Sequence, residues 1–240
     1  MSRRFYPLVM AGIALSSVAR PAAAADLSPL NWNGIYVGVS AAALAQAGDL
    51  TLSPVGDTPP DIALNPNLGG TSFFGGLYAG YNHAFGPVIA GVEADFSLGN
   101  SSSGVLSDKS SVPMSIWYAA NTLQISNDSH IRLRAGYSLG SLLLYGSAGL
   151  AIASTKLSVV GYCPPDQYTG EASRVLVGGT VGAGVEYGFT PNVIGRAEYL
   201  FDDYGRVHLS PSVDQPGGDW QDRYVKLMTN TFRVGVSYKF

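Results

Sequence analysis

The sequence contains eight segments of about ten residues in which apolar side chains alternate with small or polar ones. The segment from Val88 to Leu98 shows this most clearly, because every second residue is apolar while Glu93 and Asp95 lie between them. A period of two residues is that of a β-strand, whose successive side chains point to opposite faces. The pattern therefore predicts an all-β fold. The predicted strands cover residues 32–43, 73–85, 88–98, 129–139, 142–153, 175–189, 193–202 and 229–240.

The connections between these strands differ in length in a regular way. Short turns are predicted at 85–87, 140–141 and 190–192, where Gly, Pro, Ser and Asn gather. The other four connections are long and polar, at about 44–72, 99–128, 154–174 and 203–228. Short turns at one rim and long external loops at the other are typical of outer-membrane barrels. We therefore expect an eight-stranded antiparallel up-and-down transmembrane β-barrel with both termini at the turn rim.

A soluble β-sandwich is the alternative fold, since its strands alternate in the same way. A sandwich would carry its charges on the solvent-facing side, whereas here the charges share a face with glycines, and its long loops would not collect at one end. Only 13% of the residues are charged, which is low for a soluble surface and natural for a surface that faces lipid. Aromatic residues near the strand ends predict two interfacial girdles. The expected girdle residues are Trp32, Tyr81, Phe85, Tyr137, Tyr187, Phe189, Tyr238 and Phe240 at the turn rim, and Phe73, Phe96 and Phe201 toward the other rim.

Residues 1–25 have the layout of a cleaved secretory signal peptide. Arg3 and Arg4 precede an apolar run over residues 5–18, and small residues follow at 22–25. A membrane-anchor helix is the alternative, but the apolar run is interrupted and is shorter than the roughly 20 residues that a helix needs to cross a bilayer. We expect cleavage after Ala25, so that residues 26–240 form the barrel.

The net charge and the cysteine count exclude one class of partner and one means of stabilising the fold. Removal of Arg3, Arg4 and Arg20 leaves 11 basic and 17 acidic residues, a net charge of −6, which argues against a nucleic-acid partner. Cys163 is the only cysteine of the sequence, so the fold is expected to form without an internal disulfide.

Five acidic and five basic side chains lie on the predicted inward faces. Counting residues from each turn places acids and bases of neighbouring strands at similar heights, and ions in a narrow lumen must be paired or hydrated. We expect a network of charge-assisted hydrogen bonds that largely plugs the lumen, with Tyr36, Tyr78 and Tyr145 packed around it. A hydrated lumen wall without specific pairs is the alternative. The expected network consists of Glu93, Asp95, Arg132, Arg134, Glu186, Arg196, Glu198, Asp202, Arg233 and Lys239. The expected pairs are Glu93 with Arg134, Asp95 with Arg132, Glu186 with Arg196, and Glu198 with Arg233.

The sequence offers one weak candidate for a catalytic group. Ser126, Asp128 and His130 share one face at the upper end of the fourth predicted strand, where Asp202 could approach them. No activated nucleophile at triad spacing is evident, so His130 is more simply a polar residue at the lumen rim. The other two histidines fall on an outward face and in a loop. We expect no enzyme, no cofactor and no catalytic, cofactor-binding or metal-binding residue.

Several segments resemble the small immunogenic, porin-like outer-membrane proteins of α-proteobacteria, whose architecture is related to the OmpA transmembrane barrel. The resemblance is carried by WNGIYVG at 32–38, GVEADF at 91–96, RLRAGY at 132–137, TVGAGVEY at 180–187, RAEYL at 196–200 and the terminal Phe240. It implies a surface-exposed, antigenic barrel, and some members are credited with pore, adhesion or haem-binding activity. It also implies that Phe240 is the assembly signal, because a final aromatic residue in the last strand is read by the barrel-assembly machinery.

These observations predict a structural and surface-interaction protein of the bacterial outer membrane, with a largely plugged lumen and exposed loops. Its expected partners are outer-membrane lipid and lipopolysaccharide, the barrel-assembly machinery, and a host or matrix ligand at the loops. The first alternative is a low-conductance porin for small solutes, and the second is an outer-membrane enzyme.

Overall fold

The computed structural model describes residues 30–54, 70–108, 118–163, 166–208, 212–213 and 221–240. The predicted signal peptide, residues 1–25, lies outside this part of the chain. Among the described residues, no helix is long and apolar enough to cross a membrane.

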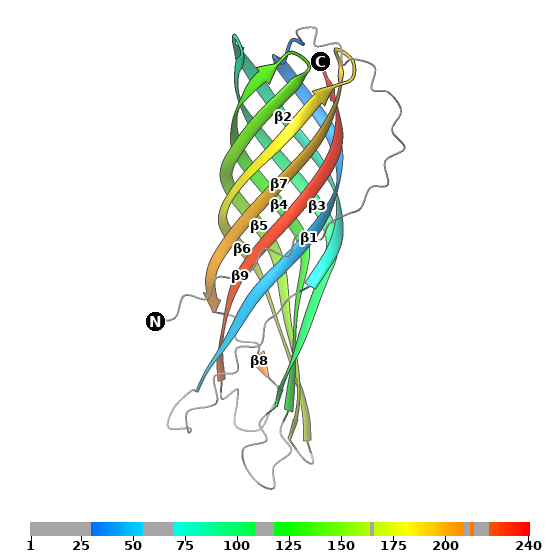
Figure 1. The fold of residues 1–240 in the computed structure, drawn as a ribbon. Coiled ribbons are helices and arrows are strands. Elements are labelled where there is room, and N and C mark those ends of the chain that lie inside the picture. Colours follow the sequence, from blue (N-terminus) through cyan, green and yellow to red (C-terminus); the bar gives the residue numbers. More distant parts are fainter. Residues whose placement is uncertain (1–29, 55–69, 109–117, 164–165, 209–211, 214–220) are drawn as a thin grey trace, which may run out of the picture.

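The described residues form eight long antiparallel strands and one strand of two residues (Figure 1). Each long strand pairs with the next one along the chain, and β9 pairs with β1, so the hydrogen-bonded sheet closes into a ring. The predicted fold class, an up-and-down barrel of eight strands, is confirmed. The strands are β1 (Gly34–Pro54), β2 (Gly70–Phe85), β3 (Val88–Asp108), β4 (Tyr118–Leu139), β5 (Leu142–Cys163), β6 (Asp166–Gly188), β7 (Val193–His208), β8 (Ser212–Val213) and β9 (Gln221–Lys239).

The three predicted turns lie together at one rim of the barrel, at the top of Figure 1. Gly86 and Gly140 have φ angles of 67° and 68°, a left-handed conformation that glycine adopts without steric cost. The carboxyl terminus lies at the same rim, where the Phe240 N–H donates to the Ile35 carbonyl at 2.9 Å. The Trp32 indole N–H, just before β1, donates to the Gly140 carbonyl at 3.1 Å. Both ends of the described barrel are therefore at the turn rim.

The strands continue well beyond their predicted ends at the opposite rim. β3 runs to Asp108 instead of Leu98, β4 starts at Tyr118 instead of Ser129, and β5 continues to Cys163. The predicted loop bounds, 44–72, 99–128, 154–174 and 203–228, were therefore wrong, since much of each range is strand. The reason is that these stretches are polar on their outer face and resemble loops in sequence, while their backbones pair with neighbouring strands.

Irregularities in three strands lie at similar heights and divide the barrel into two parts. The pairing register shifts between Leu98 and Ser101 of β3, between Ile125 and Asn127 of β4, and between Asp203 and Arg206 of β7. We call the part between the turns and these irregularities the turn-side half, and the part beyond them the loop-side half.

The irregularity in β4 is a bulge that exchanges the two faces of the strand. Asp128 and His130 are buried on the turn side of the bulge, whereas Ile125 and Leu123 are buried beyond it. Ser126 is the bulge residue and is exposed. The prediction that Ser126 shares a face with Asp128 and His130 was therefore wrong.

The irregularity in β7 exchanges faces in the same way. Asp202 and Tyr204 are buried, and beyond Gly205 it is Val207 that packs against the interior. Gly205 has a φ of 68°, which fits a bulge position that residues with a side chain rarely adopt.

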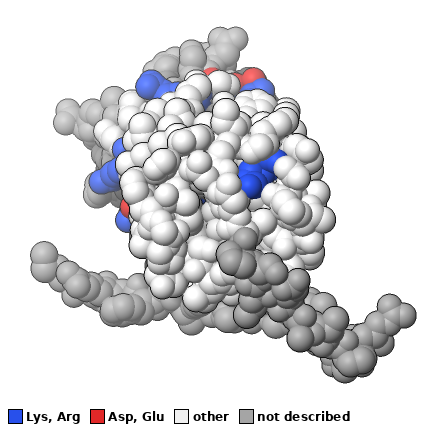
Figure 2. Space-filling view, turned by 90° about the horizontal axis from the view of Figure 1, so that it is seen from above, with Lys and Arg blue, Asp and Glu red and all other residues white. Residues whose placement is uncertain are grey.

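The turn-side half carries its apolar side chains on the outside. Leu133 is 69% exposed and Val236 is 50% exposed, although both are strongly apolar. Seen from the turn rim, the surface carries few charged side chains (Figure 2). Six of the expected girdle residues of this rim are exposed, and Tyr187 is partly buried. The exposed ones are Tyr81, Phe85, Tyr137, Phe189, Tyr238 and Phe240.

Trp32 departs from the girdle prediction. It is only 2% exposed and packs in a turn-side cluster at the barrel mouth, because the segment before β1 folds toward the lumen and its indole finds a backbone partner there. The turn-side cluster consists of Trp32, Ile89, Leu143, Tyr145 and Ile194, with Leu30 and Ala84 packed against it.

The loop-side half has the opposite distribution. Its inward side chains include a buried apolar core, with a few buried polar side chains such as Gln46 and Ser101 beside it. Outward residues such as Gln124, Lys156 and Arg206 are polar. The loop-side cluster consists of Ala42, Leu44, Phe74, Leu123, Ile125, Ala151, Ala153, Leu157, Val159, Leu176, Tyr204 and Leu227, with Val207 packed against it.

Candidate functional site

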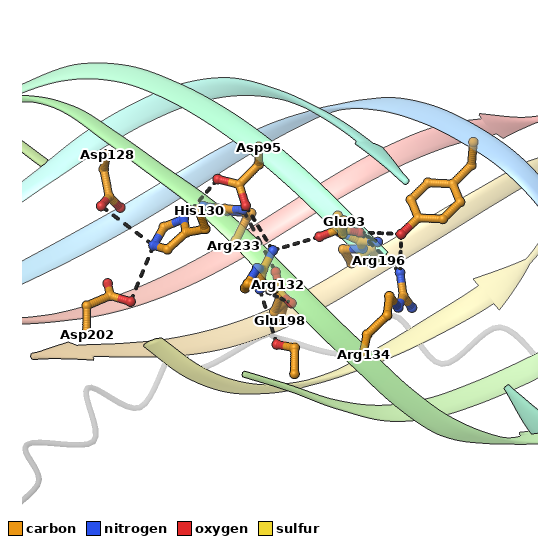
Figure 3. A network of polar contacts seen from close by, with 12 residues as sticks. Glu93, Asp95, Asp128, His130, Arg132, Arg134, Arg196, Glu198, Asp202 and Arg233 are labelled. Carbon is orange, nitrogen blue, oxygen red and sulfur yellow. Dashed lines mark hydrogen bonds and ion pairs between the residues drawn. The ribbon is translucent and has the colours of Figure 1, made fainter. Parts of the chain in front are cut away.

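The interior of the turn-side half holds a group of buried ionic side chains (Figure 3). Glu93, on β3, lies at its centre. Its carboxylate accepts hydrogen bonds from Arg132 at 2.7 Å, Arg134 at 3.1 Å and Arg196 at 2.5 Å. The Tyr36 hydroxyl, which donates to Glu93 at 2.6 Å, completes this set. One carboxylate therefore connects three guanidinium groups from β4 and β7.

Asp95 lies two residues further along the same inward face of β3. Its Oδ2 is 3.0 Å from Arg132 and 3.1 Å from Arg233, and its Oδ1 is 2.9 Å from Nδ1 of His130. Asp95 therefore links β3 to β4 and, across the lumen, to β9.

Two further carboxylates complete the connections. Glu186 on β6 accepts from Arg196 at 2.6 Å and lies 2.9 Å from Arg134. Glu198 on β7 accepts from Arg132 at 2.7 Å. These contacts join inward side chains of β3, β4, β6, β7 and β9 into what we call the charge network, which also includes Asp202 through His130.

The structure brings together nine of the ten predicted residues and separates one. Lys239 lies apart, because its ammonium group donates to the Asn31 carbonyl at the turn rim. The predicted pair Glu93–Arg134 is in contact at 3.1 Å, yet Glu93 stands opposite Arg132 in the register of β3 and β4. The offset from the predicted heights arises because neighbouring strands of a barrel are staggered.

The other three predicted pairs also lie close together. Asp95 contacts Arg132, Glu186 stands opposite Arg196, and Glu198 stands opposite Arg233 at a distance of 3.9 Å.

Three inward tyrosines pack around the guanidinium groups. Arg196 lies over the Tyr78 ring at 4.2 Å, and Arg134 lies over the Tyr145 ring at 4.0 Å, within the range of a cation–π contact. Arg134 also donates to the Tyr36 hydroxyl at 2.8 Å. Ring faces and carboxylates thus surround the arginines in place of water.

His130 occupies the loop-side end of the charge network and is only 1% exposed. The expectation of a polar residue at the lumen rim was wrong, since β4 and the interior both continue past it. Its Nε2 lies 3.3 Å from Asp202 Oδ1 and 3.6 Å from Asp128 Oδ1. The Tyr204 hydroxyl donates to Asp128 Oδ1 at 2.9 Å, and Thr229 donates to Asp202 Oδ2 at 2.7 Å.

Sequence reasoning placed His130 at the rim of the lumen and missed that His130 and Asp128 are buried at the end of the charge network. The sequence did contain a sign of this. His130 and Asp128 continue the alternation that places Arg132 and Arg134 on the inward face of β4. The candidate catalytic arrangement with Ser126 does not form, because Ser126 points outward and donates to the Ser154 carbonyl at 3.5 Å.

Comparisons with known proteins agree with this architecture. Residues 9–240 match the family model described as "Outer membrane protein beta-barrel domain". The chain is 31% identical over 232 residues to the 31 kDa outer-membrane immunogenic protein of Brucella melitensis, and the match covers 93% of this chain and 90% of that protein. It is 34% identical over 170 residues to a 22 kDa outer membrane protein of Rhizobium leguminosarum bv. viciae; this match covers 70% of the chain and 66% of the relative, just under two thirds of its length.

A solved structure shares the fold. The outer membrane protein OprG from Pseudomonas aeruginosa superposes with a TM-score of 0.51 at 11% identity, covering 89% of this chain and 98% of that one. The resemblance to immunogenic outer-membrane proteins of α-proteobacteria is confirmed by the relatives from Brucella and Rhizobium. The closed barrel, its apolar outer band and these matches lead to one conclusion: the chain belongs to the outer membrane protein β-barrel domain family and is a protein of the bacterial outer membrane.

Proposed function

We propose that this barrel is a structural and surface-interaction protein whose lumen does not conduct solutes. The observation that carries the proposal is the succession of three buried groups along the barrel axis. The turn-side cluster, the charge network and the loop-side cluster follow one another from rim to rim.

The energetics of the charge network support a closed lumen. Arg132 contacts three carboxylates, those of Glu93, Asp95 and Glu198, and is 2% exposed. Removing one partner from a buried ion pair costs about 3–5 kcal/mol, and a water path would have to separate several such contacts at once. The interior of an eight-stranded barrel is also only wide enough for side chains to fill it.

The surface role rests on the loop-side half. Its wall extends past the apolar band and presents polar groups, such as the exposed ion pair Lys156–Glu171 at 2.8 Å. The relative from Brucella melitensis is named an immunogenic protein, which supports a part exposed at the cell surface. We propose that a host or matrix ligand binds to this half of the protein.

The remaining proposed partners follow from the outer face of the turn-side half. Its exposed apolar and aromatic residues would contact outer-membrane lipid and the acyl chains of lipopolysaccharide. Phe240 is 71% exposed at the end of the last strand, which leaves its ring accessible to the barrel-assembly machinery.

Single-channel recording on the purified barrel in planar bilayers tests the closed lumen. We expect no stable open level from the unmodified protein. Arg132→Ala, which removes the side chain with three carboxylate partners, should produce transient openings. A stable open level in the unmodified protein would refute the closed lumen and favour the low-conductance porin.

Cysteine labelling of intact cells tests the surface role. In a Cys163→Ala background, Ser173→Cys lies on the outer face of the loop-side half and Thr190→Cys lies in a turn, and both positions are exposed. A maleimide that cannot cross the outer membrane should label Ser173→Cys alone. Labelling of Thr190→Cys alone would reverse the proposed orientation and remove the surface role.

A further inference from the structure

We propose that Asp128, His130 and Asp202 form a binding site for one divalent transition-metal ion of the Zn²⁺ type. Each residue offers one ligand atom, and the three atoms lie within 4.8 Å of one another. Asp128 and His130 come from β4 and Asp202 comes from β7, two strands that are not neighbours in the sheet. A bound ion would therefore connect opposite walls of the lumen (Figure 3). This inference does not depend on the proposed function.

The two distances from the imidazole nitrogen to the carboxylate oxygens match those between ligands of one metal ion, and all three ligand atoms lie within 4.8 Å of one another. His130 Nε2 is 3.3 Å from Asp202 Oδ1 and 3.6 Å from Asp128 Oδ1. Zinc bonds to imidazole nitrogen and carboxylate oxygen of about 2.0–2.2 Å place tetrahedral ligands about 3.3–3.6 Å apart. The usual N–H···O separation is shorter, at about 2.9–3.0 Å.

Two of the three ligand atoms lack a hydrogen-bond partner. His130 Nε2 and Asp202 Oδ1 face each other at 3.3 Å without forming a hydrogen bond of good geometry, and both side chains are fully buried. Buried polar atoms of this kind are rare and call for an explanation such as a bound ion. The two atoms approach each other between β4 and β7 (Figure 3).

The groups around the ligands are arranged to orient them. Asp95 Oδ1 lies 2.9 Å from His130 Nδ1, so it can accept a hydrogen bond from Nδ1–H, which leaves Nε2 as the nitrogen that binds a metal. A carboxylate behind a ligating histidine is the usual outer partner in metal sites. Thr229 donates to Asp202 Oδ2, which leaves Oδ1 for the ion, and Tyr204 donates to Asp128.

The charge balance of the interior also favours a cation. Among the described residues, six buried carboxylates share the charge network with four buried guanidinium groups, a formal net charge of −2 when His130 is neutral. Lys239 does not contribute there, because it binds the Asn31 carbonyl at the turn rim. A divalent ion bound to a neutral His130 would neutralise the interior, since buried charge without compensation is costly. The carboxylates are Glu93, Asp95, Asp128, Glu186, Glu198 and Asp202, and the guanidinium groups are Arg132, Arg134, Arg196 and Arg233.

The chemistry of the donor set indicates the class of ion. One imidazole nitrogen and two carboxylate oxygens suit Zn²⁺ and similar first-row ions, whereas Mg²⁺ and Ca²⁺ prefer oxygen ligands alone. Because apolar clusters lie on both sides of the site, we expect the ion to enter while the barrel folds.

The first experiment measures metal content after folding. The full-length protein is refolded with Zn²⁺ alone, passed over a chelating resin and analysed for zinc, and heat-modifiable gel migration confirms that each sample is folded. We expect about one Zn²⁺ per barrel. Asp202→Asn and His130→Gln should weaken the apparent affinity by at least about 100-fold, and Asp95→Asn, a positioning change, by about 10–100-fold. Glu171→Gln, an exposed acid outside the site, should bind as the unmodified protein does.

A second readout needs no variant and covers the case in which a substitution prevents folding. The unmodified protein is refolded with Co²⁺, whose visible absorption bands distinguish tetrahedral nitrogen and oxygen ligands from water. We expect tetrahedral bands that disappear when Zn²⁺ competes during refolding. A folded barrel that retains no zinc and gives only the spectrum of aqueous Co²⁺ would overturn the proposal. Equal zinc retention by Asp202→Asn, His130→Gln and the unmodified protein would overturn it as well.

Discussion

The turn-side and loop-side halves of this barrel distribute the same kinds of residue in opposite ways. In the turn-side half, Leu133 points outward with 69% exposure while Arg132, its neighbour in sequence, is buried in the lumen. In the loop-side half, Leu157 is fully buried in the lumen while Lys156, its neighbour in sequence, lies on the outer face. The backbone hydrogen bonding is continuous across the two halves on β5 and β6.

The difference shows that the surrounding solvent determines which side of a strand is apolar. Lipid around the turn-side half favours an apolar exterior, so polar side chains are confined to the lumen and must satisfy one another there. Water around the loop-side half favours a polar exterior, so burial of apolar side chains inside stabilises the wall. Each half therefore depends on a different interaction, and substitutions can separate the two.

The largest effect is expected from Arg132→Ala in the turn-side half. This change leaves Glu93, Asp95 and Glu198 without a shared cation in a buried position. The free energy of unfolding should fall by about 3–5 kcal/mol, as measured by urea titration of the folded barrel in detergent micelles. Arg174→Ala, an exposed arginine outside the charge network, is the control. Equal losses in both variants would mean that the network does not stabilise the barrel.

A loss of similar or slightly smaller size is expected from Leu157→Ala in the loop-side half. Leu157 is fully buried in the loop-side cluster, so truncation leaves a cavity and should cost about 2–5 kcal/mol. The same urea titration measures it, with Ser158→Ala on the outer face as control. If Leu157→Ala unfolded at the same urea concentration as the control, the loop-side cluster would not be a packed core.

Substituting one outward residue in each half by arginine measures the difference between the two environments directly. Leu133→Arg places a charge in the apolar band and should cost about 2–4 kcal/mol, because the side chain faces lipid. Ser102→Arg is outward and exposed in the loop-side half, and its cost should stay within about 0.5 kcal/mol. Refolding yields and urea titrations in lipid vesicles measure both. Similar costs at both positions would show that the two halves share one solvent.

The smallest effect is expected at the exposed ion pair. Lys156 and Glu171 are 2.8 Å apart, but their side chains are 42% and 62% exposed. Lys156→Ala should therefore change the free energy of unfolding by no more than about 1 kcal/mol, and added salt should reduce the difference further. A loss as large as that of Arg132→Ala would contradict the distinction between exposed and buried pairs.

The sequence contained enough information to predict the strands of the turn-side half and the direction in which their side chains point. Strict alternation placed Val92 outward and Glu93 inward, and Gly-containing turns fixed the strand order. The same alternation predicted which charges meet in the lumen, although the stagger of the strands, a property of the closed barrel, shifted the partners of Glu93. Lys239 and Trp32 could not be placed, because their positions depend on the segment that precedes β1.

The loop-side half was much less predictable. Segments such as Ser101–Ser103 have weak strand character, and they form strand because neighbouring backbones pair with them. The bulge at Ser126 reversed the alternation, so that Leu123 and Ile125 could not be recognised as inward from the pattern of the turn-side half. The surroundings of His130 depend on contacts between β4 and β7, which are distant in sequence.

The bulges at Ser126 and Gly205 also bear on how such a protein can change during evolution. Within a single strand, each bulge separates the alternating pattern of the membrane-embedded part from that of the water-exposed part. An insertion or deletion beyond the bulge therefore changes which side chains point inward only in the water-exposed part. The lipid-facing half can then stay constant while the outer half is lengthened, shortened or exchanged. We expect natural variants and engineered chimeras to join most successfully at these two positions.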